Sequence, residues 1–173
     1  MKKKLSVAGI NALTGEEFVR IIGPLFEHSP WIAENTWRRR PFAGLDALHR
    51  DLCATVREAG EEKQLALIRA HPDLVGRAAL AGTLTPSSTA EQASAGLNKL
   101  TSREILAFEV SNQLYRDKFG FPFVICARLN KKEVILEGFR KRLKHSREEE
   151  IKSALEEIFK IARLRLQDIV EAT

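Results

Sequence analysis

Helix start signals recur along this chain, and apolar residues follow each of them at spacings of three and four, as in amphipathic helices. Segments 45–59 and 61–70 carry the same apolar periodicity. We predict four helix starts from the spacing of a capping box, in which a short polar residue stands three positions before a glutamate: Thr14 and Glu17, Thr101 and Glu104, Asn130 and Glu133, Ser146 and Glu149. The pattern predicts an all-α fold, a helical bundle of about seven to nine helices.

The chain length and composition are typical of one domain with one core. It has 173 residues, of which 44% are hydrophobic, and no repeat, low-complexity tract or linker interrupts it. We therefore expect a single domain over residues 1–173. No stretch approaches the ~20 apolar residues of a membrane span, and no apolar run of signal-peptide length follows MKKK. Cys53 and Cys126 have apolar neighbours, which favours buried thiols in a reducing compartment, so we expect a cytoplasmic protein without a membrane partner.

The charge balance is moderately basic, with 28 Lys and Arg against 23 Asp and Glu and a formal net charge of +5. Basic residues gather at 38–40 and 139–147, where they could meet phosphates. We favour solvated helix faces, balanced in part by the glutamates at 148–150. Tyr115 is the only tyrosine and most phenylalanines have core-like spacing, so the chain lacks the exposed aromatics that nucleic-acid binding usually needs. We expect no nucleic-acid partner.

The segment FGFPFVICA, residues 119–127, is the one strand-like stretch. Pro122 cannot donate a ladder hydrogen bond, and no partner strand is evident elsewhere. We expect buried irregular chain or a bent entrance to a helix. Its backbone amides and carbonyls would then lack regular partners, which makes the segment either an energetic cost or a ligand-binding surface.

The segment of residues 69–97 contains few large apolar residues, so packing alone does not explain it. His71 precedes Pro72, and the helix before it should end about there because proline disfavours helical geometry in the preceding residue. A histidine titrates near neutral pH, so His71 is a candidate acid or base; a helix cap or a core filler is the alternative. Residues 76–88 form the longest loop candidate, and loops of that length are often functional.

Ser88 and Glu91 also have capping-box spacing and could simply begin the next helix. In that case Glu91 and Gln92 project from the first turn of a helix that packs through small alanines, where a ligand could approach closely. The positive end of the helix dipole favours an anionic group there.

The last helix places Arg165 close to the centre of its apolar stripe, whereas Arg163 falls off the stripe and should be solvated. An arginine on a core face needs a partner. The sequence leaves two alternatives open, an internal acid and a substrate contact.

A metal site is not expected. His71, Asp73 and Glu91 are possible ligands, but the other histidines are scattered and the two cysteines are far apart in sequence.

Four motifs together resemble one family: HPDLVGR at 71–77, GTLTPSSTAEQASAGL at 82–97, FGFPFVICA at 119–127 and IARLRL at 161–166. They occur in the order and at the spacings of the decarboxylases of 2-oxo-4-hydroxy-4-carboxy-5-ureidoimidazoline (OHCU), which complete the oxidation of urate to (S)-allantoin. The resemblance implies an all-α homodimer that acts on a small cyclic ureide without metal or organic cofactor. The chain ends in IVEAT rather than in a peroxisomal address, which favours a bacterial cytoplasmic enzyme.

The resemblance also assigns roles by position. It makes His71 the catalytic histidine. The chemistry of the reaction adds His71 as candidate acid and base, Glu91 as a catalytic partner that orients His71 or holds the ureido N–H groups, and Gln92 as a reader of the ureide. The resemblance assigns the substrate-binding positions to Pro72, Ser88, Thr89, Ala90, Gln92, Phe123, Val124, Ile125, Cys126, Ala127 and Arg165. Two other functions remain open from the residues alone: a hydrolase of a related cyclic ureide, and a basic helical adaptor without catalysis.

Overall fold

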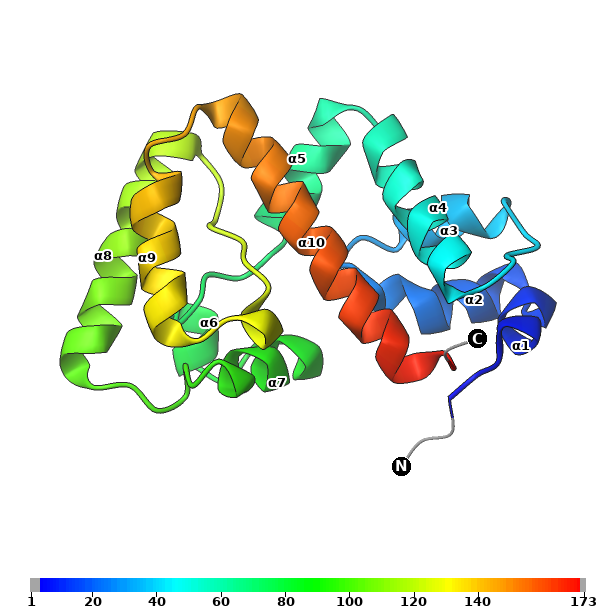
Figure 1. Ribbon diagram of the computed structural model, residues 1–173, viewed down its shortest axis with the longest axis horizontal. Helices are drawn as coiled ribbons and strands as arrows, with labels where there is room; N and C mark the ends of the chain where they lie inside the picture. Colours follow the sequence, from blue (N-terminus) through cyan, green and yellow to red (C-terminus); the bar gives the residue numbers. More distant parts are fainter. Residues whose placement is uncertain (1–3, 172–173) are drawn as a thin grey trace. The chain divides into compact units, whose positions relative to one another are not determined.

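A computed structural model of the chain describes residues 4–171. Figure 1 shows that this part of the chain is built from helices, and its one β feature is a parallel bridge between Leu5 and Val170. The predicted all-α class is confirmed, and eight of the α-helices in the described range have seven or more residues. The elements are α1 (Val7–Ala12), α2 (Gly15–Ile22), η1 (Gly23–Leu25), α3 (Trp31–Trp37), α4 (Leu45–Glu58), α5 (Glu61–Arg69), α6 (Arg77–Leu80), α7 (Pro86–Ser94), α8 (Ser102–Phe119), η2 (Ala127–Leu129), α9 (Lys132–Arg142) and α10 (Arg147–Ile169).

The chain packs as two compact units. The first unit takes the chain up to Ala70 together with the chain from Phe159 onward, and the second takes His71–Ile158. The boundary therefore falls within α10. A single domain over residues 1–173 stays a prediction. No helix of residues 4–171 combines the length and the apolar character that a bilayer crossing requires.

Three of the four predicted capping boxes are present. Thr14 and Glu17 cap α2, and Thr101 and Glu104 cap α8, each with both reciprocal hydrogen bonds. At Ser146, the backbone N–H donates to Glu149 Oε2 at 2.7 Å and the hydroxyl accepts from the Glu149 N–H at 3.2 Å. The box at Asn130 was wrong, because α9 begins after Lys131 and the Asn130 amide donates instead to the Cys126 carbonyl at 2.9 Å.

In the first unit, α3 packs on both α2 and α4, and the fully buried apolar side chains include Phe18, Ile32 and Leu52. The hydroxyls of Thr36 and Thr55, 2.7 Å apart, join α3 to α4 inside this core. Cys53 is a buried free thiol, as predicted.

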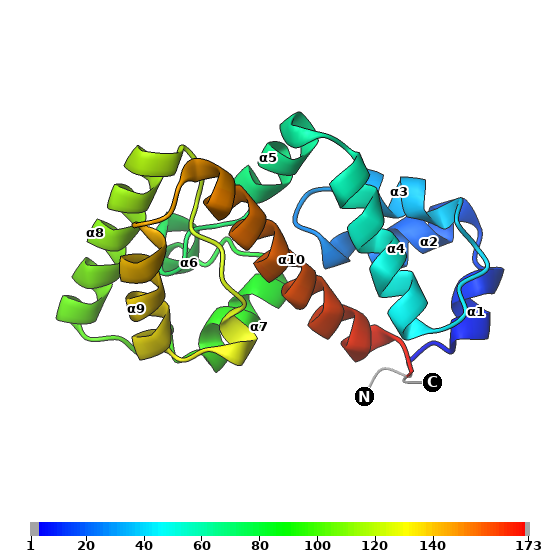
Figure 2. The same cartoon turned by 45° about the horizontal axis from the view of Figure 1, so that its top comes forward.

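The second unit has an aromatic core that includes the irregular segment before η2. Helices α8 and α9 lie side by side in both views (Figures 1 and 2). Phe123 stacks on Phe139 of α9, with ring centroids 3.9 Å apart, and meets Tyr115 of α8 edge-on at 5.2 Å. The prediction of buried, irregular chain is confirmed at residues 121–126. The side chains of this segment anchor it in the core and so fix the course of its backbone.

Candidate active site

His71 lies just beyond the end of α5 and is buried, with 7% of its surface exposed. The chain that follows is held against α8 by two side chains. Arg116 pairs with the Asp73 carboxylate, its Nε lying 2.9 and 3.1 Å from the two oxygens. Asn112 donates to the Leu74 carbonyl at 2.8 Å. The position of His71 is therefore set by a fixed segment rather than by a mobile loop.

This segment ends in a tight turn. Val75 has a φ of +55°, a left-handed conformation that is rare for a β-branched residue, and a Cβ added at Gly76 would lie 2.6 Å from the Asp73 Cβ. Only glycine fits at position 76 without a shift of the backbone. Strained backbone of this kind persists where the surroundings over-determine it, and it clusters at functional sites.

Helix α7 begins earlier than the sequence suggested. Thr85 is its N-cap and accepts from the Ser88 N–H at 3.2 Å, and Pro86 occupies the first turn. The capping reading of Ser88 was therefore wrong, and Glu91 and Gln92 lie in the second turn rather than the first. The predicted loop over residues 76–88 was too long, because it contains α6 and the start of α7.

The predicted binding residues of α7 fall on different faces. Ser88 and Gln92, four residues apart, are buried, whereas Thr89 and Ala90 are exposed. The Gln92 side chain spans the turn after His71: its Oε1 accepts from the Val75 N–H at 3.1 Å, and its Nε2 lies 3.4 Å from the Asp73 carbonyl. Gln92 thus ties α7 to the His71 segment and keeps one N–H for a ligand.

The same helix also contacts η2, which begins at Ala127 where the irregular segment ends. Helix α7 packs on η2, and the Lys131 ammonium donates to the Ser94 carbonyl at 3.0 Å. Burial raises the pKa of the Cys126 thiol, and the negative charges of Glu157 and Glu91 raise it further.

The backbone of residues 123–127 is only partly used by the protein. Arg142 Nη1 donates to the Val124 carbonyl at 2.6 Å, and the Cys126 N–H donates to Glu157 Oε2 at 2.8 Å. Among the described residues, nothing accepts from the N–H groups of Phe123, Val124 and Ile125. Four of the five side chains are buried, those of Phe123, Val124, Cys126 and Ala127, and Ile125 is half-buried. A ligand of this segment would therefore meet backbone donors rather than side chains.

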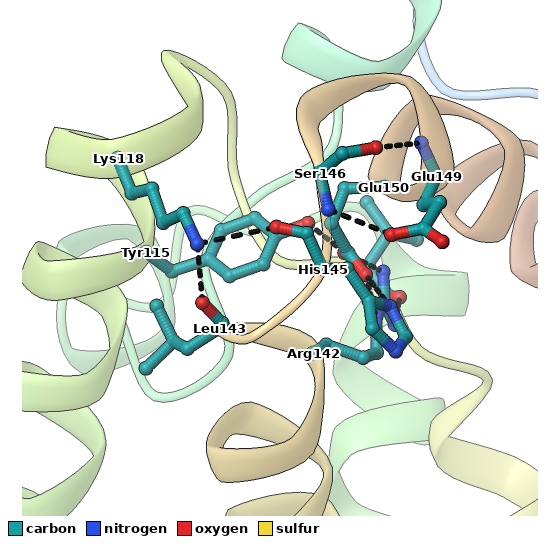
Figure 3. Close-up of polar contacts among 9 residues, drawn as sticks. Tyr115, Lys118, Arg142, Leu143, His145, Ser146, Glu149 and Glu150 are labelled. Carbon is teal, nitrogen blue, oxygen red and sulfur yellow. Dashed lines mark hydrogen bonds and ion pairs between the residues drawn. The ribbon is translucent and has the colours of Figure 1, made fainter.

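Arg142, which donates to the Val124 carbonyl, belongs to a charged cluster centred on Glu150, and Figure 3 shows this cluster. Glu150 is fully buried, and its carboxylate accepts from the Tyr115 hydroxyl, from Arg142 Nε at 2.9 Å and from His145 Nδ1 at 2.8 Å. Arg142 Nη2 also lies 2.9 Å from this carboxylate, although outside hydrogen-bond geometry. Burial raises the pKa of Tyr115, and the bond to Glu150 adds to this, so the phenol stays a donor.

The sequence interpretation of these charged runs as solvated was wrong for Arg142 and Glu150. Glu157, which caps the Cys126 N–H, was also missed. One signal could have indicated that Glu150 is buried, because it lies at the edge of the wide face that α10 buries. The charge pattern of a single sequence, however, does not identify the residues that pair with Glu150.

Arg165 belongs to the first unit. Its Nη2 lies 2.9 Å from Glu27 Oε1, and both side chains are buried, with 6% and 3% exposed. The Pro24 and Leu25 carbonyls lie 3.4 Å from Nη1. Arg165 therefore pairs with an internal acid, Glu27, which is the first of the two alternatives that the sequence left open. The half-exposed Arg163 pairs with Asp46 at 2.6 Å, in agreement with the helical-face prediction.

His71 lines neither of two hollows in the second unit. One, of about 320 Å³, is mostly apolar and is lined by residues of α6, α7 and the start of α8, including Val75 and Gln92. The other, of about 450 Å³, is charged and is lined by Arg142, His145 and residues of α10. Within residues 4–171, no three His, Cys, Asp or Glu side chains are grouped as a metal site would need.

Comparison with known proteins places the chain in a family. Residues 11–167 match the family model of OHCU decarboxylase. The 2-oxo-4-hydroxy-4-carboxy-5-ureidoimidazoline decarboxylase of Halalkalicoccus jeotgali is 40% identical over 166 residues, 96% of this chain and 92% of that protein. The protein of the same name from Amia calva is 41% identical over 165 residues, 94% of this chain and 93% of that protein.

A solved structure supports the same relationship. The crystal structure of (S)-allantoin synthase superposes with a TM-score of 0.77 at 27% identity over 96% of this chain, which spans 54% of that longer chain. The chain therefore belongs to the OHCU decarboxylase family.

Proposed function

We propose that this chain decarboxylates OHCU to (S)-allantoin in urate degradation. The observation that carries the proposal is the position of α7 between the predicted site segments. Gln92 of α7 bonds to the turn after His71, and the same helix packs on η2. The segment before η2 contains the unpartnered N–H groups of residues 123–125. Family membership supports the substrate, because the relatives carry its name.

The reaction needs no electron sink beyond the substrate itself. When the bond to the carboxylate breaks, its electron pair forms a double bond to the ureido-bearing carbon, and the ring C=N pair moves onto nitrogen, which takes a proton. The hydroxyl then loses its proton and becomes the ring carbonyl, while the ureido-bearing carbon takes a proton. One CO₂ leaves and one proton is gained overall. The protein must hold the carboxylate out of the ring plane and protonate one face.

We assign the proton transfer to His71, because it is buried, held on a fixed segment and able to titrate near neutral pH. Glu91 orients His71 or holds the ureido N–H groups. The remaining N–H of Gln92 and the backbone N–H groups of residues 123–125 donate to substrate oxygens, which stabilises the enol-like intermediate.

The side chains of Phe123, Val124, Cys126 and Ala127 act by shaping this backbone. Pro72, Ser88, Thr89, Ala90 and Ile125 complete the proposed binding set. Arg165 is proposed as a further ligand, with its guanidinium preoriented by Glu27.

The finer properties that the family implies are part of the same proposal. We propose a homodimer in the cytoplasm that takes a small cyclic ureide and uses neither metal nor organic cofactor.

The test is CO₂ release from freshly generated OHCU by the wild-type chain and by His71→Asn. We expect acceleration by the wild type and a loss of about 100-fold or more in His71→Asn, because removal of a proton carrier typically has this effect. His28→Asn is the matched control: His28 is exposed, and asparagine tolerates its φ of +46°. Ring opening without CO₂ would indicate a hydrolase, and no acceleration an adaptor. Near-wild-type turnover in a folded His71→Asn would overturn the assignment of His71.

A further inference from the structure

We propose that Arg142 of α9 is a positioning residue for the reaction proposed above: it holds the peptide group between Val124 and Ile125, and so presents the Ile125 N–H to the substrate. The inference rests on the proposed function, because this N–H is one of the backbone donors assigned there. Arg142 acts through the peptide group and does not itself touch the substrate.

The first observation is the hydrogen bond that fixes the peptide group. Arg142 Nη1 donates to the Val124 carbonyl oxygen at 2.6 Å. A peptide group is planar and trans, so its C=O and its N–H point in opposite directions. Because the Val124 carbonyl is turned toward Arg142, the Ile125 N–H is turned to the opposite side. Among residues 4–171 nothing accepts from this N–H, which leaves it available to a ligand.

The second observation is that Arg142 is itself held in place. Figure 3 shows its guanidinium beside the fully buried Glu150, with Nε 2.9 Å from a carboxylate oxygen. The guanidinium carbon also lies over the Phe123 ring, 4.3 Å from its centroid. The guanidinium is planar and has fixed donor directions, so a carboxylate, a ring face and a carbonyl together leave it one orientation. The position of the Val124 carbonyl is therefore set by a rigid donor.

The third observation is that the next peptide group is held as well. The Cys126 N–H donates to Glu157 Oε2 at 2.8 Å. Ile125 therefore stands between two peptide groups, one bonded to a side chain of α9 and the other to a side chain of α10. Its backbone cannot rotate without breaking one of these bonds. The direction of the Ile125 N–H is thus set before a substrate binds, as transition-state stabilisation by preorganised donors requires.

Two effects of Arg142 on this N–H differ in size. A hydrogen bond to the carbonyl polarises the peptide group and strengthens its N–H as a donor by roughly 10–30%. The fixed direction is worth more, because removing one donor aimed at a developing oxyanion typically lowers kcat about 100- to 1,000-fold. Loss of Arg142 leaves the N–H present but no longer fixed, so we expect a smaller decrease in kcat, of about 10- to 100-fold.

The test is the kinetics of CO₂ release by Arg142→Met. We expect the decrease in kcat together with a KM within about threefold of wild type, because the donor matters most for the charge that develops during the reaction. Arg142→Lys should also lose activity, since an ammonium keeps the charge but lacks the planar fork that reaches both Glu150 and Val124. Arg140→Met is the matched control: Arg140 lies on the same helix, its side chain is 80% exposed, and the variant should keep the wild-type kcat.

A second variant separates activity from stability. Arg142→Met leaves the buried Glu150 carboxylate without its charge partner, which should lower the melting temperature. The double variant Arg142→Met with Glu150→Gln removes both charges of the pair, and its melting temperature should recover much of the loss, because apolar or neutral replacement of a buried pair is often tolerated. We expect the kcat of the double variant to stay low, since the Val124 carbonyl is still not held.

The outcomes separate this inference from the proposed function. A wild type that releases no CO₂ would overturn both. An active wild type together with Arg142→Met and the double variant both within about threefold of its kcat would overturn the positioning role alone. The same conclusion would follow if kcat recovered with the melting temperature in the double variant, or if the effect of Arg142→Met were confined to KM.

Discussion

Replacing Glu150 by glutamine should be among the most destabilising single changes in this chain, although the two side chains are the same size. The Glu150 carboxylate is fully buried and is shared by Tyr115, Arg142 and His145 (Figure 3). The amide in Glu150→Gln can still accept from the Tyr115 hydroxyl. It carries no charge, so it cannot neutralise the positive charge of the Arg142 guanidinium, whose side chain is only 11% exposed.

The magnitude follows from the unpaired charge that this change leaves behind. Removing one partner of a buried ion pair typically costs about 3–5 kcal/mol, because the remaining charge is neither solvated nor neutralised. For a chain of this length, 1 kcal/mol corresponds to about 2–4 °C in the melting temperature. We therefore expect Glu150→Gln to melt about 6–20 °C below wild type.

The assay is urea unfolding at pH 7.5 together with a thermal melt. Glu149→Gln is the matched control, because it removes the same charge from the preceding residue, which is exposed and takes part in a capping box. We expect a much smaller loss in the control. If Glu150→Gln were within about 1 kcal/mol of wild type, the buried cluster would not have the role inferred for it.

Three further predictions concern the proposed site and the pH dependence. Glu91→Gln should lower kcat/KM about 100-fold without changing the melting temperature, whereas Thr85→Ala should lose about 1 kcal/mol of stability and keep its activity, since Thr85 caps α7. Burial lowers the pKa of His49, so below pH ~6.5 the unfolded chain binds more protons than the folded chain. The free energy of unfolding should therefore fall as the pH drops from ~7 through the lowered pKa. Urea unfolding at pH 5.5 and 7.5 measures this dependence, and His49→Gln should remove the part of it that His49 causes. Dialysis against EDTA should leave CO₂ release unchanged, and a loss that added zinc restores would contradict the metal-free proposal.

Local signals predicted most of the fold. The capping boxes at Thr14, Thr101 and Ser146 depend on residues three positions apart, and the segments 45–59 and 61–70 form α4 and α5 within a residue or so. The start of α7 was misplaced, although a threonine N-cap followed by proline is itself a strong start signal. The predicted cap at Asn130 does not form, because the Asn130 side chain donates to the carbonyl of Cys126, four residues earlier.

The candidate site was predicted less completely, for a physical reason. The helical-face argument correctly separated the buried Arg165 from the half-exposed Arg163. The side chains that bond to the backbone of residues 123–127 are Arg142 of α9 and Glu157 of α10. Both lie among other charged residues in the sequence, and such a pattern does not predict which groups they bond to. Gln92 shows the same limit, because its bonds to the turn after His71 depend on tertiary packing.

The central claim, that this chain itself protonates one face of the decarboxylated intermediate, is tested most directly by the configuration of the product. OHCU is generated in solution, the chain is added, and CO₂ and the optical activity of allantoin are followed together. Protonation in free solution has no preferred face, so the uncatalysed reaction gives a racemate. The account predicts that CO₂ release accelerates and that allantoin accumulates as the S enantiomer at the same rate. Racemic allantoin formed at the uncatalysed rate would contradict it.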